Sequence, residues 1–173
     1  MKCLTTLEFE NWCETRGIEV PLSGAVNFKT GKNLRVITEM PVSVRERKST
    51  LREIFTFFEK DSGFFVQLRC WNEFSMDAGI VEFILALRRQ HGEPRTLSES
   101  PVHFFSNDEV KLCLGFLDLV VAFDWEAVWV PANTCNVIWS HVDEHLILVS
   151  KEQELIQSIT KQMTATGTVF QEF

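Results

Sequence analysis

The sequence contains no tyrosine, although 15 phenylalanines and 5 tryptophans give it an aromatic content of 12%. The absence of tyrosine removes one type of general acid from any active site. The sequence also has no glycine-rich phosphate loop, no Cys-x-x-Cys pair and no Gly-x-Ser-x-Gly nucleophile elbow. These absences exclude the enzyme classes that such motifs identify, namely P-loop nucleotide hydrolases, dithiol oxidoreductases and hydrolases with a standard nucleophile elbow.

An excess of positive charge is also missing, because the net charge is −7. This balance argues against nonspecific binding to nucleic acid. Up to Arg89 there are 13 Lys and Arg against 12 Asp and Glu, whereas the remainder has 4 against 12. The acidity therefore belongs to the second half, where it predicts either a solvated surface or a face that attracts a basic partner.

Long hydrophobic runs are absent. The most apolar run, Leu112 to Phe123, is interrupted by Asp118 and is too short to cross a membrane. Met1-Lys2-Cys3-Leu4 leads into polar sequence, so we expect no signal peptide. The 5 cysteines are odd in number and widely spaced, which predicts reduced thiols in a cytoplasmic protein. No pattern calls for a cofactor.

Hydrophobic periodicity alternates between helical and strand-like segments along the chain. Predicted helices begin at Thr5, Thr50, Ser75, Asn107 or Asp108, and Ser150, and strands are expected over 25–28, 34–40, 64–71, 102–105, 126–130, 136–140 and 145–149. This order predicts one α+β domain over residues 1–163, with a largely antiparallel or mixed sheet packed by about five helices. Residues 164–173 are expected to form a loose C-terminal tail.

Three local signals make sharper predictions. Thr5 and Glu8 have the spacing of a capping box, as do Thr50 and Glu53. The turn Thr30-Gly31-Lys32-Asn33 predicts a hairpin between the two strands that flank it. The basic run Arg45–Arg52 is expected to be a solvated entry to the second helix, with anion binding at the helix N-terminus as the alternative.

The segment Trp139-Ser140-His141-Val142-Asp143-Glu144-His145 concentrates the residue types of catalysis and metal binding. His141, Asp143, Glu144 and His145 are metal-ligand candidates, and His141 and Asp143 are candidates for general acid–base catalysis. Cys135 is a candidate nucleophile, if the fold brings it to a histidine. The spacing does not match the helical His-Glu-x-x-His zinc pattern, and apolar flanks predict strands. A charged hairpin tip or a partner-binding loop is therefore the favoured interpretation. His103 is expected on a half-buried strand.

The tryptophans form a second candidate surface, because several of them sit in or beside predicted strands with acidic neighbours. Tryptophan is enriched at interface hot spots, although sheet packing explains such positions equally well. The predicted binding residues are Trp125, Glu126, Trp129, Trp139, His141, Asp143 and Glu144.

From Phe64 to Val149 the chain resembles a family of small, uncharacterised bacterial proteins of unknown function. The matching motifs are Trp71, Leu87-Arg88, Gly92, Pro101, His103-Phe104-Phe105, Asp108-Glu109, Trp125, and Ser140-His141 with Asp143-Glu144. Val142 interrupts the last motif, which is contiguous in the family. The resemblance implies a compact single domain and brings no activity, cofactor or substrate with it.

These observations favour a non-enzymatic cytoplasmic binding or regulatory protein. It would engage a protein partner with a basic surface through an acidic, tryptophan-bearing face of the second half. A hydrolase or metal-dependent enzyme centred on His141–His145 is the first alternative. A small-ligand domain with a pocket lined by Phe and Trp is the second. No nucleic acid or membrane partner is predicted.

Overall fold

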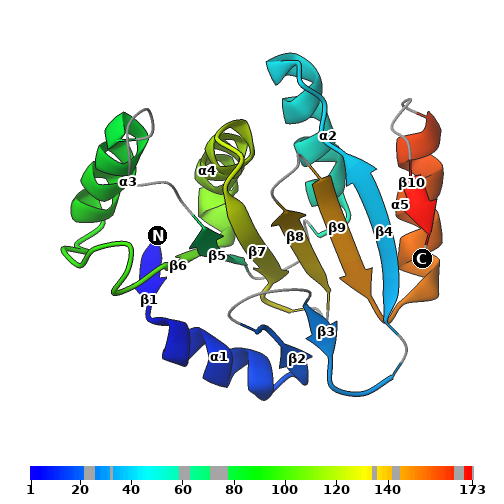
Figure 1. Ribbon diagram of the computed structural model, residues 1–173, viewed down its shortest axis with the longest axis horizontal. Coiled ribbons are helices and arrows are strands. Elements are labelled where there is room, and N and C mark those ends of the chain that lie inside the picture. The colour runs from blue at the N-terminus through cyan, green and yellow to red at the C-terminus, as the bar shows by residue number, and fades with distance from the viewer. Residues whose placement is uncertain are drawn as a thin grey trace.

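A central antiparallel sheet organises the fold (Figure 1). The computed structural model describes residues 1–21, 26–31, 33–58, 63–70, 78–133, 136–141, 145–165 and 170–172. Eight strands follow the order β1-β6-β5-β7-β8-β9-β4-β10, and a separate two-stranded ribbon pairs β2 with β3. The strands are β1 (Lys2–Leu4), β2 (Ile18–Glu19), β3 (Asn27–Phe28), β4 (Leu34–Glu39), β5 (Phe64–Cys70), β6 (Val102–Phe105), β7 (Glu126–Pro131), β8 (Val137–His141), β9 (His145–Ser150) and β10 (Phe170–Glu172).

Helices cover both faces of this sheet, to different extents. They are α1 (Thr6–Glu14), α2 (Val44–Thr56), α3 (Ala78–Gln90), the short 3-10 turn η2 (Asn107–Glu109), α4 (Val110–Ala122) and α5 (Gln153–Ala165). Helices α2, α3, α4 and α5 contribute to the larger of two hydrophobic cores. Helix α1 and the β2–β3 ribbon contribute to the smaller core on the opposite face. The predicted α+β class with a largely antiparallel sheet is confirmed.

Side-chain alternation along the central strands produces the two cores. On β5, Phe64, Val66 and Leu68 join the larger core, whereas Phe65 joins the smaller one. Successive side chains of a strand point to opposite faces, so a strand with apolar residues at every position is buried on both sides. β5 is apolar at its first three positions, Phe64 to Val66, and it lies between β6 and β7 in the sheet.

Two local predictions are confirmed in detail. The side chain of Thr5 accepts a hydrogen bond from the backbone N–H of Glu8, and the Glu8 carboxylate accepts from the Thr5 N–H. This capping box fixes the start of α1, and Gly17 ends the turn after it with a φ of 66°. The hairpin predicted around residues 142–144 is also present, since β8 pairs with β9 in antiparallel register.

The hairpin predicted across Thr30–Asn33 is wrong. β3 pairs with β2, while β4 pairs with β9 along six residue positions and with β10 on its other side. Pairing with β9 buries Val36 of β4 against the larger core, which a two-residue strand such as β3 cannot do. The local turn signal therefore loses to the long-range burial that β4 gains in the sheet.

The second helix and the chain end also differ from prediction. Helix α2 starts at Val44 after Ser43, so Thr50 lies inside the helix, where it is buried, rather than at its cap. The basic run accordingly belongs to the body of α2. The C-terminal segment is not wholly a loose tail, because Phe170–Glu172 forms β10 at the edge of the sheet. Figure 1 shows the two termini at opposite edges.

Candidate functional site

The predicted tryptophan surface does not exist in the expected form. Trp125, Trp129 and Trp139 are only 2%, 0% and 7% exposed, so they cannot supply an exposed contact face. Trp125 and Trp129 pack in the larger core and Trp139 packs in the smaller one. Large aromatic side chains in a sheet buried on both faces contribute to folding before they contribute to binding. The prediction that these residues form an exposed interface is wrong.

Glu126, another of the predicted contact residues, is bonded to side chains within the protein. Its Oε1 lies 3.2 Å from Arg69 Nη1 and accepts a hydrogen bond of 3.0 Å from the Trp139 indole N–H. Arg69 also donates to the carbonyl of Pro21 at 2.6 Å. A half-buried carboxylate with these partners positions β5, β7 and β8 relative to one another. It is not a free acid that awaits a basic partner.

The acidic second half of the chain pairs with the first half. Asp118 of α4 binds Arg47 of α2, with 2.9 Å between Oδ1 and Nε, and its Oδ2 lies 3.4 Å from Lys48 Nζ. Glu109 binds the N-terminal ammonium of Met1. Three acidic residues of the second half, Glu109, Asp118 and Glu126, thus pair with groups of the first half, whereas Glu99, Asp108, Asp124, Glu152 and Glu154 are exposed.

The His141–His145 segment lies at the turn between β8 and β9. The backbones of His141 and His145 face each other as the last pair of the ladder. The side chains of His141, Val142, Asp143 and Glu144 lie outside the described residues, as does Cys135. His145 is half-buried and lines a small recess with Asp124 and Ser140. Within the described residues, no group of three His, Cys, Asp or Glu side chains could hold a metal ion.

Described residues of α2 and α4 form a groove with a volume of about 610 Å³. We call it the α2–α4 groove. Its apolar part consists of Leu51, Phe55, Val110 and Leu114, its basic part of Lys48, Arg52 and Lys111, and Thr56 and Gly115 complete the lining. A hollow that is mainly apolar with a few convergent polar groups is the usual form of a binding site.

The two helices that form the groove, α2 and α4, are linked by an ion pair. The contact is the Arg47–Asp118 ion pair, in which both side chains are largely buried. Lys48 follows Arg47 on α2 and is mostly exposed, so its ammonium reaches the rim of the groove while remaining close to Asp118. Removal of one partner of this pair would leave a largely buried charge without its counter-ion, so the pair couples the positions of the two helices.

Gly115 is the unexpected part of the lining. It lies in the interior of α4, where glycine destabilises a helix by about 1 kcal/mol relative to alanine. Its φ is not positive, so the backbone conformation does not require glycine. No described atom outside the helix backbone lies within 4 Å of the position that a Cβ would occupy. Packing within the described part of the chain therefore does not explain the glycine either.

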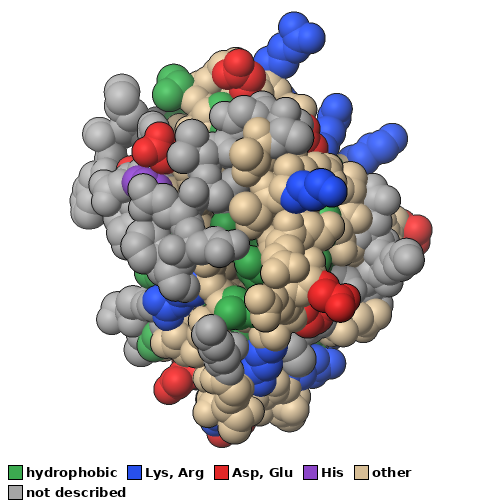
Figure 2. Space-filling model, turned by 90° about the vertical axis from the view of Figure 1, so that its right-hand side faces the viewer, with side chains coloured by type: hydrophobic (Ala, Val, Ile, Leu, Met, Phe, Trp, Pro, Cys, Tyr) green, Lys and Arg blue, Asp and Glu red, His purple; other side chains and the backbone are tan. Residues whose placement is uncertain are grey.

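Figure 2 shows one face of the molecule, on the side where β10 and α5 lie in Figure 1. Among its coloured atoms, hydrophobic side chains form small, separated areas, and Lys and Arg side chains project from the upper end. Exposed hydrophobic side chains that occur singly are ordinary on a protein surface. Concave shape, apolar floor and clustered cations occur together at the α2–α4 groove.

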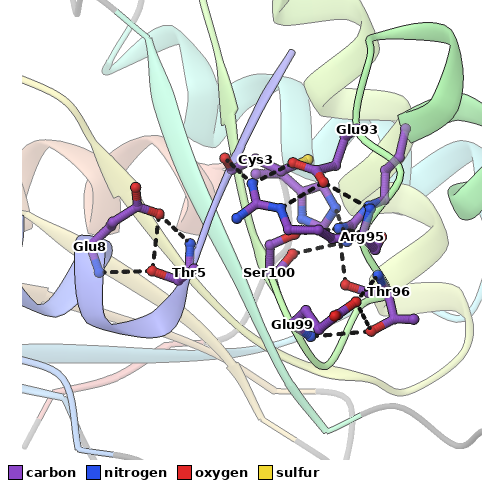
Figure 3. A network of polar contacts seen from close by, with 10 residues as sticks. Cys3, Thr5, Glu8, Glu93, Arg95, Thr96, Glu99 and Ser100 are labelled. Atoms are coloured by element: carbon purple, nitrogen blue, oxygen red, sulfur yellow. Dashed lines mark hydrogen bonds and ion pairs between the residues drawn. The ribbon is translucent and has the colours of Figure 1, made fainter.

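A second polar cluster is closed to ligands. Arg88 of α3 is 0% exposed, and its guanidinium donates to the carbonyls of Arg95, Thr96 and Ser100 at 2.9–3.1 Å and to the Ser100 hydroxyl. We call these residues, with His103, the Arg88 cluster. Figure 3 shows the segment around it, in which Glu93 binds Arg95 and Glu99 binds Thr96. The cluster closes the loop between α3 and β6.

His103 is the titratable member of the Arg88 cluster. Arg88 Nη1 lies 3.4 Å from His103 Nε2, and Phe105 and Phe116 flank the imidazole ring. Burial, followed by the charge of Arg88, lowers the pKa of His103 to about 3, so the ring is neutral at physiological pH. The prediction of a half-buried strand position is wrong in degree, because His103 is fully buried. The ring packs in the interior and has no access to substrate.

The described cysteines show no sign of activation. Cys3, Cys13 and Cys113 are free and buried. Burial raises the pKa of Cys13 to about 12 and also raises the pKa values of Cys3 and Cys113. A catalytic thiol needs a lowered pKa, because the thiolate is the nucleophile. These three residues therefore pack as small hydrophobic side chains.

Comparison with known proteins finds no matching family model, no similar curated protein and no similar solved structure. The resemblance of Phe64–Val149 to small bacterial proteins stays a prediction. Of its motif residues, Arg88 and His103 lie together, with 3.4 Å between Nη1 and Nε2. None of the helices in the described part of the chain is long and apolar enough to cross a membrane.

Proposed function

We propose that this chain is a non-enzymatic binding protein that takes up a segment of a protein partner in the α2–α4 groove. The observation that carries the proposal is the groove itself, in which the half-buried Val110 and Leu114 lie beside the buried Leu51 and Phe55. Surface hollows of this composition are the sites at which partner side chains are removed from water. The proposal keeps the protein-binding role favoured by the sequence and moves the contact surface.

The contact surface moves because four of the seven predicted contact residues are held within the fold. Trp125, Trp129 and Trp139 are buried, and Glu126 is bound by Arg69 and Trp139. The residues that replace them in the proposal come from α2 and α4. A reducing compartment such as the cytoplasm suits the chain, because its described cysteines are free thiols in the interior.

Two other functions stay open as predictions. A hydrolase or metal-dependent enzyme would depend on side chains of the β8–β9 turn that lie outside the described residues. A small-ligand protein is favoured by one observation, since a volume of about 610 Å³ falls in the range of small-molecule sites. The groove runs between two helices of 13 residues each and is open to solvent, which suits a long ligand such as a peptide better.

Selection from a random-peptide display library against the full chain tests the proposal. We expect peptides that bind the wild-type protein and lose binding to the Leu114→Glu variant, because the new carboxylate lies in the apolar floor. The matched control is Leu7→Glu, since Leu7 is an exposed leucine on α1, away from the groove. Selected peptides that bind all three proteins equally, or no selected peptides at all, would contradict the proposal.

A further inference from the structure

We infer that the α2–α4 groove receives an acidic amphipathic helix of the partner, and that this helix crosses α4 most closely at Gly115. The inference rests on the proposed function and adds to it the conformation, the charge and the register of the bound segment. Three features of the groove carry it: the absence of exposed backbone donors along its walls, the cations on its rim and the bare backbone at Gly115.

The walls of the groove favour a helix over an extended segment. Both walls are α-helices, whose interior N–H and C=O groups are bonded within each helix. An extended peptide gains most of its affinity by adding to the open edge of a sheet, and these walls offer no such edge. A helix satisfies its own backbone and needs only side-chain contacts. At 1.5 Å per residue, the lining residues span about 12 Å on α2 (48–56) and about 8 Å on α4 (110–115), enough to contact about two turns of a partner helix.

The rim of the groove favours an acidic partner. Lys48, Arg52 and Lys111 line it with their cationic ends exposed, on a chain whose net charge is −7. Asp118, the carboxylate close to Lys48, is already bound by Arg47. A positive groove on an acidic protein attracts and orients a segment whose apolar stripe is flanked by carboxylates. It also repels basic helices, which gives the site selectivity.

Gly115 sets the place of closest approach. Alanine would favour the helical conformation here, and the Cβ would point into empty space. A Cβ at this position would, however, occupy part of the groove. Helices approach each other most closely where one of them lacks a side chain, as at small-residue crossings in other helix pairs. The glycine therefore serves the bound state, and the free protein would be more stable without it.

A flat membrane surface fits these features less well than a helix. The apolar residues form the floor between α2 and α4, where a planar bilayer does not reach them. Membrane-binding helices instead present a protruding apolar face to the lipid. Anionic vesicles are therefore a necessary comparison, because they share negative charge and apolar character with the proposed partner.

The test measures binding of synthetic peptides to the full chain by fluorescence anisotropy. The probe is a peptide of about four helical turns with Leu at i, i+4 and i+7 on one face and Glu on both flanks. We expect it to bind at least ~10-fold more tightly than the same peptide with Lys in place of Glu. Binding should weaken as salt is raised, because the rim cations are exposed.

Variants of the protein then locate the crossing point. Gly115→Ala should weaken binding of the acidic peptide ~3- to 10-fold while raising the melting temperature of the protein. Gly79→Ala on α3 is the matched control, since its added Cβ also meets no described atom and should leave binding unchanged. Lys111→Gln should weaken binding, whereas Lys161→Gln on α5 should not.

The outcomes separate this inference from the proposed function. Groove-dependent binding of peptides that are neither acidic nor helical would overturn the inference and leave the proposed function standing. Absence of any groove-dependent binding would overturn both. Equal weakening by Gly115→Ala and Gly79→Ala, or tighter binding to anionic vesicles than to the acidic peptide, would also overturn the inference.

Discussion

The Arg88 cluster and the α2–α4 groove both place arginine side chains away from water, but they use them differently. Arg88 is fully enclosed and bonded to carbonyls and a hydroxyl of the loop it closes. Arg47 is bonded to Asp118 on a neighbouring helix, and the two helices that it joins leave a hollow beside the pair. The guanidinium of Arg88 is bonded within the loop, whereas the rim of the groove leaves cations exposed beside half-buried apolar side chains.

This difference separates polar residues that fold the protein from those that are available for binding. The Arg88 cluster contains two of the motif residues singled out in the sequence, Arg88 and His103, and both are fully buried. The groove contains no recognisable motif and combines shape, charge and a glycine that the fold itself does not use. The candidate site is identified by side chains that are accessible to solvent and are not fully bonded within the fold, more than by residue type.

The largest loss of stability is expected when the guanidinium of Arg88 is removed. Arg88→Met leaves the carbonyls of Arg95, Thr96 and Ser100 without their donor in the interior. We expect the free energy of unfolding to fall by about 3–5 kcal/mol, measured by urea denaturation. Peptide binding at the groove should persist in the folded fraction. A loss below about 1 kcal/mol would show that the cluster does not hold the loop.

Acid should destabilise the protein through His103. The pKa of this ring is about 3 in the folded protein, against an ordinary value near 6.5, so the unfolded chain binds the extra proton. The stabilisation is therefore complete above about pH 6.5 and is lost as the pH falls toward 3, by at most about 1.4 kcal/mol per pH unit. His103→Gln should flatten the slope between pH 6 and 5. An unchanged slope in that variant would contradict the assignment.

The pKa of Glu93 produces a separate loss at lower pH. The hydrogen bond from Arg95 lowers this pKa to about 2, below the ordinary value near 4.5. The folded protein therefore keeps this carboxylate charged longer than the unfolded chain does, and the associated stability is lost as the pH falls from about 4.5 to 2. Glu93→Gln should flatten the acid limb in that lower window and leave the slope between pH 6 and 5 intact.

The groove side of the comparison depends on the Arg47–Asp118 pair. A double-mutant cycle with Arg47→Met and Asp118→Asn should give a coupling free energy of about 1–2 kcal/mol. The exposed pair between Lys29 and Glu14 serves as the control and should show no measurable coupling. The single variants should also weaken peptide binding, because α2 and α4 lose their fixed separation. A coupling free energy of the expected size with unchanged peptide binding would show that the ion pair does not shape the groove.

The smallest expected change concerns Gly115. Gly115→Ala should raise the free energy of unfolding by about 0.5–1 kcal/mol, measured by thermal or urea denaturation. The added Cβ meets no described atom, so no strain opposes this gain. A destabilised variant would mean that the glycine serves packing within the chain. The proposal that Gly115 is kept for binding would then be wrong.

Local patterns predicted the parts of the fold that depend on neighbouring residues. Thr5 and Glu8 identify the start of α1 because a capping box is made by residues three apart. The apolar run of β5 and the β8–β9 hairpin are similarly local. The partner of β4 was missed, because pairing with β9 joins segments more than one hundred residues apart. The same limit applies to the tryptophans, whose burial depends on helices elsewhere in the chain.

The candidate site was harder to predict, because its two walls are far apart in the sequence. Lys48 and Arg52 lie one turn apart on α2, and Lys111 and Gly115 lie one turn apart on α4. One sequence signal was present and unused: a glycine in the middle of a strongly apolar helix, where alanine is the better helix former. That signal marks α4 as unusual but does not identify α2 as its neighbour.

The most direct test of the account is a nuclear magnetic resonance titration of the full chain with the acidic amphipathic peptide. We predict that the backbone amides of Lys48, Lys111, Leu114 and Gly115 shift as peptide is added, while those of Arg88, Ser100 and His103 do not. Shifts centred on the Arg88 cluster, or on the β8–β9 turn at His145, would contradict the claim that the α2–α4 groove is the binding site.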